Sequence, residues 1–294
     1  MSKSILLIGC NGQVGTELQK TLQPYNNLKA VARPIVELAQ PETLGDLIKE
    51  NQPEIIINAA AYTAVDKAES EPELAHTINA IAPKVLAQEA EKSGAFLIHI
   101  STDYVFDGKT NHPYGENDST NPLSVYGKTK LAGEEGIRSN CNNYLILRTA
   151  WVYGSFGKSN FVKTMLRLGA QKPELRVVAD QIGSPTWAKD IAQIIAGLIP
   201  KTSRIIGTYH YTNSGVASWY DFAVAIFEEA KQLGFPLKIE QVIPITTSEY
   251  PTPATRPGYS VLNCGKISSL MESYPPHWRQ SLREMLQEFQ QVNQ

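Results

Sequence analysis

The feature that most constrains the fold is a glycine turn between an apolar run and a helix near the start of the chain. Residues 3–8 form the apolar run, and apolar residues at helical spacing follow over 13–22. Gly9, Gly12 and Gly15 punctuate this junction in the pattern G-x-x-G-x-x-G. Glycine lets a backbone turn sharply and approach a phosphate, and the free amides at a helix start attract anions. The context favours a dinucleotide site over a turn that is merely tight.

The same alternation of strand and helix continues to about residue 150. Short apolar runs without polar alternation are typical of parallel strands buried on both faces. The expected strands are 28–32, 54–58, 95–100 and 144–147, and the expected helices are 41–50, 72–93 and 122–138. This order predicts an α/β fold with a doubly wound parallel sheet, in which ligands bind at the carboxyl ends of the strands.

Beyond residue 150 the alternation loosens. The expected helices are 161–169, 188–198, one starting at Ser218 and 277–291, and the expected strands are 176–179 and 207–212. Asp221, three residues after Ser218, completes a capping-box pattern. Residues 236–257 contain five prolines and are expected to be loop-rich and to cover a pocket. We expect 1–150 to form a dinucleotide-binding core, and 151–294 to return partly to that core and form a smaller C-terminal substrate-binding lobe.

Composition excludes several classes of protein. The 294 residues include 27 Lys plus Arg and 29 Asp plus Glu, with no basic run that predicts binding to nucleic acid or an acidic membrane. No apolar stretch is long enough for a membrane span or a signal peptide, so we expect a cytoplasmic protein. Cys10, Cys141 and Cys264 are far apart and lack zinc spacing, which predicts buried free thiols. The histidines also lack ligand spacing, and His99 is interpreted as a core residue.

The end of the second expected strand bears on the choice of cofactor. An acidic residue there would bind the ribose 2′-hydroxyl of NAD, but the sequence has Ala32 followed by Arg33. A guanidinium binds phosphate through two donors, so the pair favours NADPH over NADH, although Arg33 could instead be a solvated surface charge. Glu37 is expected near the adenosine.

The third expected strand leads into NAAAYTAVD, residues 58–66, where small side chains would let a cofactor lie against the backbone. Close helix packing would explain these small residues almost as well. The full set of expected cofactor contacts is Gly9, Asn11, Gly12, Gln13, Val14, Gly15, Arg33, Glu37, Leu38, Ala59, Ala60, Ala61, Thr63, Tyr126 and Lys130.

Two tyrosines precede a lysine by four residues, namely Tyr25 with Lys29 and Tyr126 with Lys130. Tyr25 falls at the far end of the first helix, whereas Tyr126 starts the helix after the fourth strand, at the ligand edge of the sheet. Residues i and i+4 share a helix face, so Lys130 is expected beside Tyr126. There its ammonium would stabilise the ionised phenol. We interpret Tyr126 and Lys130 as a proton-delivery pair.

The fourth strand ends in STDYVFDG, residues 101–108. The Thr102 hydroxyl is expected to hold a carbonyl oxygen, and Asp103 to orient a hydroxyl or relay a proton. The predicted catalytic residues are therefore Thr102, Asp103, Tyr126 and Lys130. Glu134 and Glu135, further along the following helix, are expected to face water.

Taken in order, these features make the chain similar to the extended short-chain dehydrogenase/reductase family, whose core is a Rossmann-like sheet. Eight segments resemble one branch of that family over nearly the whole chain: GQVGTELQ, NAAAYTAVDKAESEPELA, STDYVFDG, VYGKTKLAGE, RTAWVYG, NFVKTMLRL, DQIGSPT and YPTPATRPGYSVLN. The resemblance implies reduction of the C4 ketone of dTDP-4-dehydro-6-deoxy-L-mannose to dTDP-L-rhamnose, with NADPH or NADH as the hydride donor.

The resemblance also implies roles for single residues. Tyr126 would protonate the forming O4 alkoxide, Lys130 would bind the nicotinamide ribose and ease ionisation of the phenol, and Thr102 would bind the oxygen. The implied substrate contacts are Thr102, Asp103, Tyr104, Trp151, Asn160, Gln181 and Arg256. Trp151 could instead be ordinary core, and a loop arginine such as Arg256 is as often simply solvated.

Some relatives are described as pairing through a magnesium ion held by glutamates. Glu17 and Glu288 match those glutamates, but Lys189 stands where a further one is expected. Because a cation there would repel the metal, we predict no metal ion, and the resemblance leaves a homodimer open.

Two rival functions remain to be weighed. Dehydratases on the same scaffold carry Thr-Asp-Glu at the strand end, whereas Tyr104 follows Thr102 and Asp103 here, so the carboxylate needed for elimination is missing. The regulatory subunit of methionine adenosyltransferase is a cofactor-binding protein with the same glycine turn and Tyr-x-x-x-Lys pattern. Motifs separate it poorly from the reductases, but turnover of a 4-keto sugar nucleotide would distinguish the two.

Overall fold

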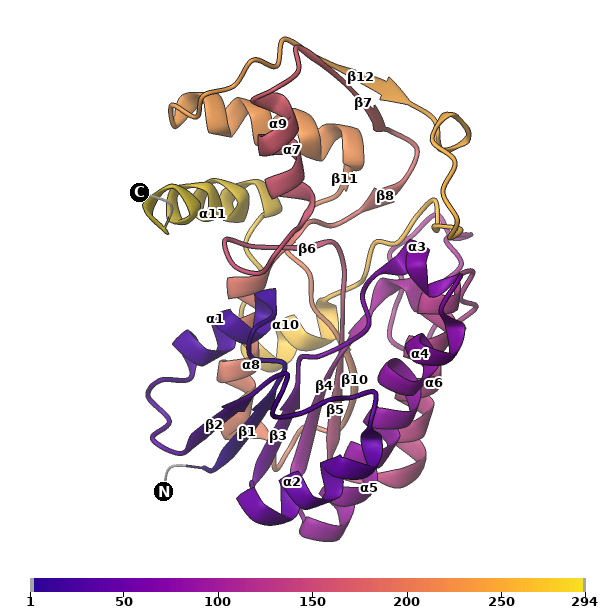
Figure 1. Ribbon diagram of the computed structural model, residues 1–294, viewed down its shortest axis with the longest axis vertical. Coiled ribbons are helices and arrows are strands. Elements are labelled where there is room, and N and C mark those ends of the chain that lie inside the picture. The colour runs from indigo at the N-terminus through magenta and orange to yellow at the C-terminus, as the bar shows by residue number, and fades with distance from the viewer. Residues whose placement is uncertain (1–2, 293–294) are drawn as a thin grey trace.

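The structure, a computed structural model, describes residues 3–292 and comprises a sheet covered by helices with a smaller lobe above it (Figure 1). Within those residues the main sheet has six strands in the order β10-β5-β4-β3-β1-β2, and all neighbours are parallel. The strands are β1 (Ile5–Ile8), β2 (Leu28–Val31), β3 (Ile55–Asn58), β4 (Phe96–Thr102), β5 (Tyr144–Thr149) and β10 (Gly207–His210). The predicted doubly wound parallel sheet is confirmed, and its topological switch point lies between β1 and β3.

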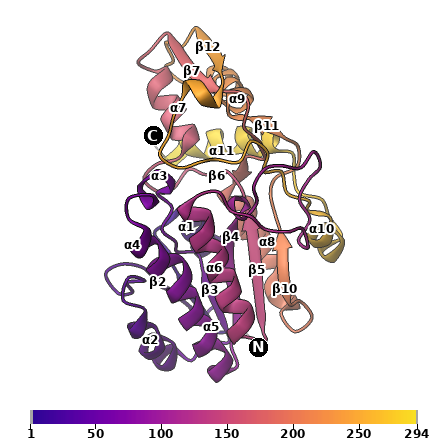
Figure 2. The same cartoon turned by 90° about the vertical axis from the view of Figure 1, so that its right-hand side faces the viewer.

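Alternate residues of each strand pack on opposite faces of the sheet. Ile5 and Leu7 of β1 belong to the apolar cluster formed with α1 (Gln13–Thr21) and α8 (Ala188–Leu198). Leu6 and Ile8 belong to a second cluster, formed with the helices on the other face, α2 (Leu44–Asn51), α5 (Ala82–Ser93) and α6 (Val125–Asn140). Figure 2 shows these last helices in front of the sheet. Burial on both faces explains why the strands read as unbroken apolar runs.

The expected helix 72–93 contains a local widening. It consists of α4 (Pro72–His76), a π-helical turn η2 (Thr77–Ile81) and α5. The turn brings the backbone of Asn79 against α6, where a Cβ added to Gly133 would lie 2.1 Å from the Asn79 carbonyl oxygen. The Asn79 amide also donates to the Thr129 hydroxyl of α6, at 3.2 Å. Glycine at 133 therefore permits the close approach that positions α6.

Among residues 3–292, the α-helices of the smaller lobe are α7 (Phe161–Gly169), α9 (Trp219–Gln232) and α11 (Trp278–Val292). The expected capping box at Ser218 is present, with Asp221 as its second member. The prediction that residues 236–257 are loop-rich was wrong in part, because β12 (Gln241–Ile245) pairs in parallel with β7 (Glu174–Val178). Pro244 can lie in β12 because the ladder has one partner strand and its other edge needs no N–H donor.

The remaining elements are short and were not expected. They are η1 (Pro41–Thr43), α3 (Val65–Ala68), η3 (Asp103–Val105), β6 (Val152–Tyr153), β8 (Ile182–Gly183), β9 (Thr186–Trp187), η4 (Ile199–Lys201), β11 (Ala217–Ser218), η5 (Thr247–Glu249) and α10 (Gly265–Met271). Cys10, Cys141 and Cys264 are free thiols, as predicted, although Cys264 is only half-buried. Within residues 3–292, no helix combines the length and apolar character that crossing a membrane requires.

Gly133→Ala tests the close packing of α6 on the π-helical turn. We expect the variant to be destabilised by about 1–3 kcal/mol, because the added methyl group would overlap the Asn79 carbonyl. Gly45→Ala, in α2, is the matched control: its nearest neighbour would be the Glu89 side chain at 3.6 Å, so alanine should stabilise the helix by about 1 kcal/mol. Urea denaturation measures both changes, and equal effects would contradict the packing argument.

Candidate active site

The glycine turn forms a cradle that fits a diphosphate. Gly9 has a φ of 88°, and a Cβ there would lie 2.7 Å from the Ala60 nitrogen. A Cβ on Gly15 would lie 2.1 Å from the Gly9 carbonyl oxygen. No side chain of residues 3–292 caps the amides at the start of α1, and its first turn contains no acidic residue. The backbone is thus open to an anion at a helix N-terminus.

The other expected cofactor residues surround this turn unevenly. Ala59 donates its backbone N–H to Ile8, and Ala60 lies against Gly9, so the small residues after β3 do border the turn. Arg33, just after β2, is exposed. Two expected contacts are engaged elsewhere: Leu38 is buried in the apolar cluster of α2 and α5, and the Glu37 carboxylate accepts from the Ala39 N–H at 3.1 Å.

The end of β4 and the start of α6 bring four of the expected residues together. Ser124 caps α6 by accepting from the Gly127 N–H at 3.2 Å, which places Tyr126 in the first turn. The Tyr126 ring meets Tyr104 edge-on, with 5.5 Å between ring centroids. The Thr102 hydroxyl donates to Asp103 at 3.0 Å and accepts from the Tyr104 N–H.

The second Tyr-x-x-x-Lys pair lies elsewhere. Tyr25 follows the end of α1 and packs against the apolar cluster formed with α1 and α8. The structure therefore places Tyr126, and not Tyr25, at the carboxyl edge of the sheet, as the sequence indicated.

Burial shapes the acid–base properties of this cluster. It raises the pKa of Tyr126 to about 12, an effect that the Thr102 hydroxyl opposes and the Asp103 charge reinforces. Burial likewise raises the pKa of Asp103 to about 6. Hydrogen bonds from the Ser260 and Thr102 hydroxyls oppose this rise. At neutral pH the phenol carries its proton and can act as an acid.

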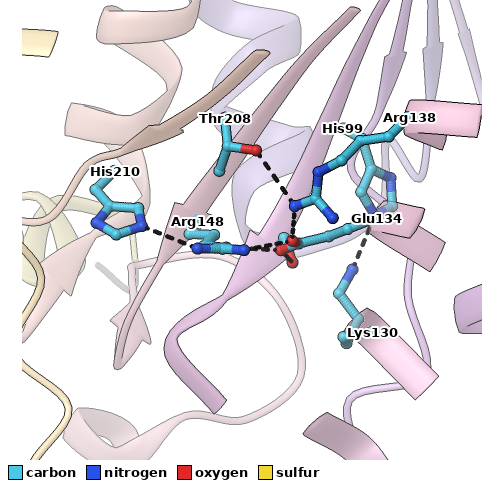
Figure 3. Close-up of polar contacts among 8 residues, drawn as sticks. His99, Lys130, Glu134, Arg138, Arg148, Thr208 and His210 are labelled. Carbon is cyan, nitrogen blue, oxygen red and sulfur yellow. Dashed lines mark hydrogen bonds and ion pairs between the residues drawn. The ribbon is translucent and has the colours of Figure 1, made fainter. Parts of the chain in front are cut away.

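Lys130 lies one helical turn beyond Tyr126 and is buried. Its side-chain nitrogen donates to the Ile100 carbonyl at 2.7 Å. The same nitrogen lies 3.2 Å from His99 Nε2 (Figure 3). Burial lowers the pKa of Lys130 to about 8, with the Glu134 charge opposing the shift. His99, which the sequence suggested was ordinary core, is therefore in direct contact with a predicted catalytic residue.

The expectation that Glu134 faces water is wrong. Its side chain is 0% exposed, because Glu134 follows Lys130 by one turn on the face of α6 that packs on the sheet. It accepts from Arg148 at 2.9 and 2.7 Å, and also from Arg138 (Figure 3). It accepts further from the Ser101 hydroxyl at 2.6 Å. Arg148 and Ser101 belong to β5 and β4, so this network fastens the helix to both strands.

The aromatic contact expected for the sugar is stacked against the smaller lobe. The rings of Trp151 and Trp219 are parallel, with centroids 3.5 Å apart. Trp151 has a φ of 48°, in the left-handed region, and a Cβ on Gly183 would lie 2.5 Å from its indole. Trp151 remains half-buried, so it is neither fully core nor free.

Two other expected substrate residues form bonds within the protein. The Asn160 side chain donates to Gln13 at 2.7 Å and to the Gly154 carbonyl at 2.8 Å, and it caps α7 by accepting from the Lys163 N–H. It therefore joins the lobe to the first residue of α1. Gln181 is buried and donates to the Thr247 hydroxyl at 3.1 Å.

Arg256 is anchored to the first half of the chain. It forms two parallel bonds to Asp66, at 3.0 and 2.8 Å, and also donates to Thr252. Its charge contributes to the electrostatic environment of the Tyr104 phenol and opposes the rise in the pKa of that group that burial causes. The loop around Arg256 thus lies near Tyr104, and the alternative that Arg256 is simply solvated does not hold.

The two glutamates considered as metal ligands lie close to a lysine. Lys189 is 3.8 Å from Glu288, and burial together with the Glu288 charge raises the pKa of Glu17 to about 7. Within residues 3–292, no group of three or more His, Cys, Asp or Glu side chains is arranged to hold a metal ion. That no metal binds stays a prediction.

A tyrosine and a lysine on one helix face, beside the glycine turn of a parallel sheet, are characteristic of the short-chain dehydrogenase/reductase class. The family model described as the RmlD substrate binding domain matches residues 3–291. The chain is 44% identical to the dTDP-4-dehydrorhamnose reductase of Salmonella typhimurium, over 97% of both chains. It belongs to the dTDP-4-dehydrorhamnose reductase family.

Solved structures agree with this placement. A dTDP-4-dehydrorhamnose reductase from Clostridium acetobutylicum is 42% identical with a TM-score of 0.90, covering 98% of this chain and 99% of its own. A second, from Bacillus anthracis and in complex with NADP, is 39% identical with a TM-score of 0.91, covering 98% and 100%.

Asp103→Asn tests the buried carboxyl group. A raised pKa means that ionisation is costlier in the folded state, so Asp103 favours folding while protonated and loses that contribution as pH rises from about 4 to about 6. Relative to the asparagine variant, the native protein should lose about 3 kcal/mol of unfolding free energy across that range. Urea denaturation at several pH values measures the difference, and parallel curves for the two proteins would refute the assignment.

Proposed function

We propose that this protein reduces the C4 ketone of dTDP-4-dehydro-6-deoxy-L-mannose to dTDP-L-rhamnose with NADPH. The proposal rests mainly on one observation, the meeting of Tyr126 with Thr102 and Asp103 at the carboxyl end of β4, with Lys130 one turn away. Relatives of this chain in the same family are named dTDP-4-dehydrorhamnose reductase, which is the activity proposed here. Such a biosynthetic enzyme would act in the cytoplasm.

The residues of this chain divide the work of the reduction. When bound, the cofactor supplies a hydride to C4. Tyr126, protonated at neutral pH, gives its proton to the O4 alkoxide, since a phenol is a stronger acid than the sugar hydroxyl that forms. The Thr102 hydroxyl, which donates to Asp103 in the structure, would turn to donate its hydrogen bond to the same oxygen. Lys130 in its ammonium form stabilises the phenolate that remains and binds the nicotinamide ribose.

The cofactor site combines the glycine cradle with Arg33. The amides of α1 would hold the diphosphate, the alanines after β3 would line the nicotinamide half, and Arg33 would bind the 2′-phosphate that distinguishes NADPH. The relative from Bacillus anthracis, solved with NADP, supports this choice. NADH remains the second cofactor to test.

The substrate would lie between the sheet and the smaller lobe. Tyr104 and Asp103 face its sugar from the η3 turn, and Trp151 would contact the sugar ring. Arg256 would bind the diphosphate, while Gln181 and Asn160 would act on the nucleotide side. In this arrangement residues 1–150 bind the cofactor and also supply the catalytic residues and Tyr104, while 151–294 return partly to the core and form the substrate-binding lobe. Self-association as a homodimer is compatible with this arrangement.

Tyr126→Phe should retain NADPH binding but lose turnover by at least about 100-fold, because the variant has no proton to give to O4. Tyr25→Phe is the matched control, since it removes the phenol of the other Tyr-x-x-x-Lys pair and should leave turnover unchanged. Absorbance at the nicotinamide band with the 4-keto sugar nucleotide measures both. Full turnover by Tyr126→Phe would remove the acid role. Cofactor binding without turnover in the native protein would instead favour a regulatory protein.

Arg33→Ala should raise the KM for NADPH by about tenfold and leave that for NADH unchanged, because only NADPH has a 2′-phosphate for the guanidinium to bind. Arg204→Ala, which removes another exposed arginine, is the control. Steady-state kinetics with each cofactor test the expectation. An equal change in both KM values would mean that Arg33 does not bind the 2′-phosphate of NADPH.

A further inference from the structure

Behind the predicted catalytic lysine, three buried side chains form a line across β3, β4 and α6. Asn58 and His99 are directly paired in the register of β3 and β4. The Asn58 amide nitrogen lies 3.1 Å from His99 Nδ1, and Lys130 Nζ lies 3.2 Å from His99 Nε2. All three side chains are at most 1% exposed, so bulk water does not hydrogen-bond to them. Figure 3 shows the contact between His99 and Lys130.

The backbone N–H of Ala60 determines which atoms of Asn58 and His99 carry the protons of these hydrogen bonds. The Ala60 N–H donates to Asn58 Oδ1 at 3.1 Å. A backbone N–H can only donate, so the amide oxygen of Asn58 must face Ala60 and its NH₂ must face His99. His99 Nδ1 therefore accepts. Burial holds the pKa of His99 well below its ordinary value, and the neutral ring carries its one proton on Nε2.

In this tautomer the Nε2–H group of His99 is a hydrogen-bond donor that faces the Lys130 side-chain nitrogen. An ammonium has three N–H donors and no acceptor, so the Nε2–H of His99 opposes it. A neutral amine has a lone pair that accepts from Nε2–H, and it can still donate to the Ile100 carbonyl at 2.7 Å. The geometry therefore fits the amine form better than the ammonium form.

We propose that His99 is a positioning residue, held by Asn58 as an N–H donor that disfavours the ammonium form of Lys130. Its relevance to the reduction rests on the proposed function of Lys130. Lys130 must be charged to stabilise the phenolate of Tyr126, yet the His99 donor favours the uncharged form of Lys130.

The charges around Lys130 are consistent with this balance. Burial lowers its pKa to about 8, and Glu134 on the same helix opposes the shift. Glu134 is itself paired with Arg148 of β5 and with Arg138. Asp103 of η3 and Tyr126 are the other titratable groups at this end of α6, and Asp103 acts on the Tyr126 phenol.

The sign of the pH dependence follows. The ammonium form of Lys130 is present below its pKa and is lost as pH rises through about 8. Any step that needs the ammonium therefore declines on that alkaline limb. Removing the opposing donor should move the limb to higher pH.

Two variants change the donor by different means. His99→Leu removes it without adding charge. Asn58→Asp keeps an oxygen for the Ala60 N–H and places a second oxygen at His99 Nδ1, so the proton moves to Nδ1 and Nε2 becomes an acceptor for the ammonium. Asn111→Asp, which adds the same charge on an exposed loop, is the control. Thermal denaturation checks that each variant folds.

The primary measurement is NMR of the cofactor-free protein. Ring ¹⁵N shifts should show His99 as the Nε2–H tautomer, and its assignment is feasible because the chain has five histidines. The titration of the Lys130 side chain should move up by about one pH unit in both His99→Leu and Asn58→Asp, and not in the control. The alkaline limb of kcat/KM should move with it.

An Nδ1–H tautomer in the native protein, or a Lys130 titration unmoved in His99→Leu, overturns the proposal. A purely structural role for His99 would lower the melting temperature and leave the titration in place. These results are independent of the proposed reduction, which fails separately if Tyr126→Phe retains full turnover.

Discussion

The site depends on the buried ion pair between Glu134 and Arg148. Two charges removed from water must satisfy each other closely, and breaking such a pair by deleting one partner costs about 3–5 kcal/mol. Here the carboxylate is satisfied by Arg148 on β5, Ser101 on β4 and Arg138 on its own helix. Because the pair joins the middle of α6 to β5 of the sheet, it fixes the rotation and the height of the helix that carries Tyr126 and Lys130.

Two periodicities then place the predicted catalytic residues. Along β4, His99 and Ser101 point to the same face because they are two residues apart, and along α6, Lys130 and Glu134 do so because they are four apart. The two pairs of residues meet across the interface between β4 and α6, where His99 contacts Lys130 and Ser101 donates to Glu134. Tyr126, one turn earlier on the helix, is thereby carried to the end of the strand, where Thr102 and Asp103 lie.

Much of this arrangement could be predicted from the sequence, because local rules decide it. The strands of the sheet, the glycine turn and the choice of Tyr126 over Tyr25 follow from apolar runs and from the edge at which each residue falls. The environments of His99 and Glu134 could not be read in this way, since each residue alone resembles ordinary core or ordinary surface. Their matched spacing on strand and helix was the signal available. The β12 strand was missed because its ladder partner is more than sixty residues away, and proline masked its pattern.

The bond between Arg256 and Asp66 has a consequence for ligand recognition. A carboxylate already occupies the guanidinium through two bonds, so the loop that carries Arg256 is ordered before any ligand arrives. The conformational entropy of that loop is lost during folding, and little of it remains to be lost on association. Asp66 is thus the anion that Arg256 binds within the protein. A ligand that took the place of Asp66 would have to offer the arginine more negative charge than one carboxylate does.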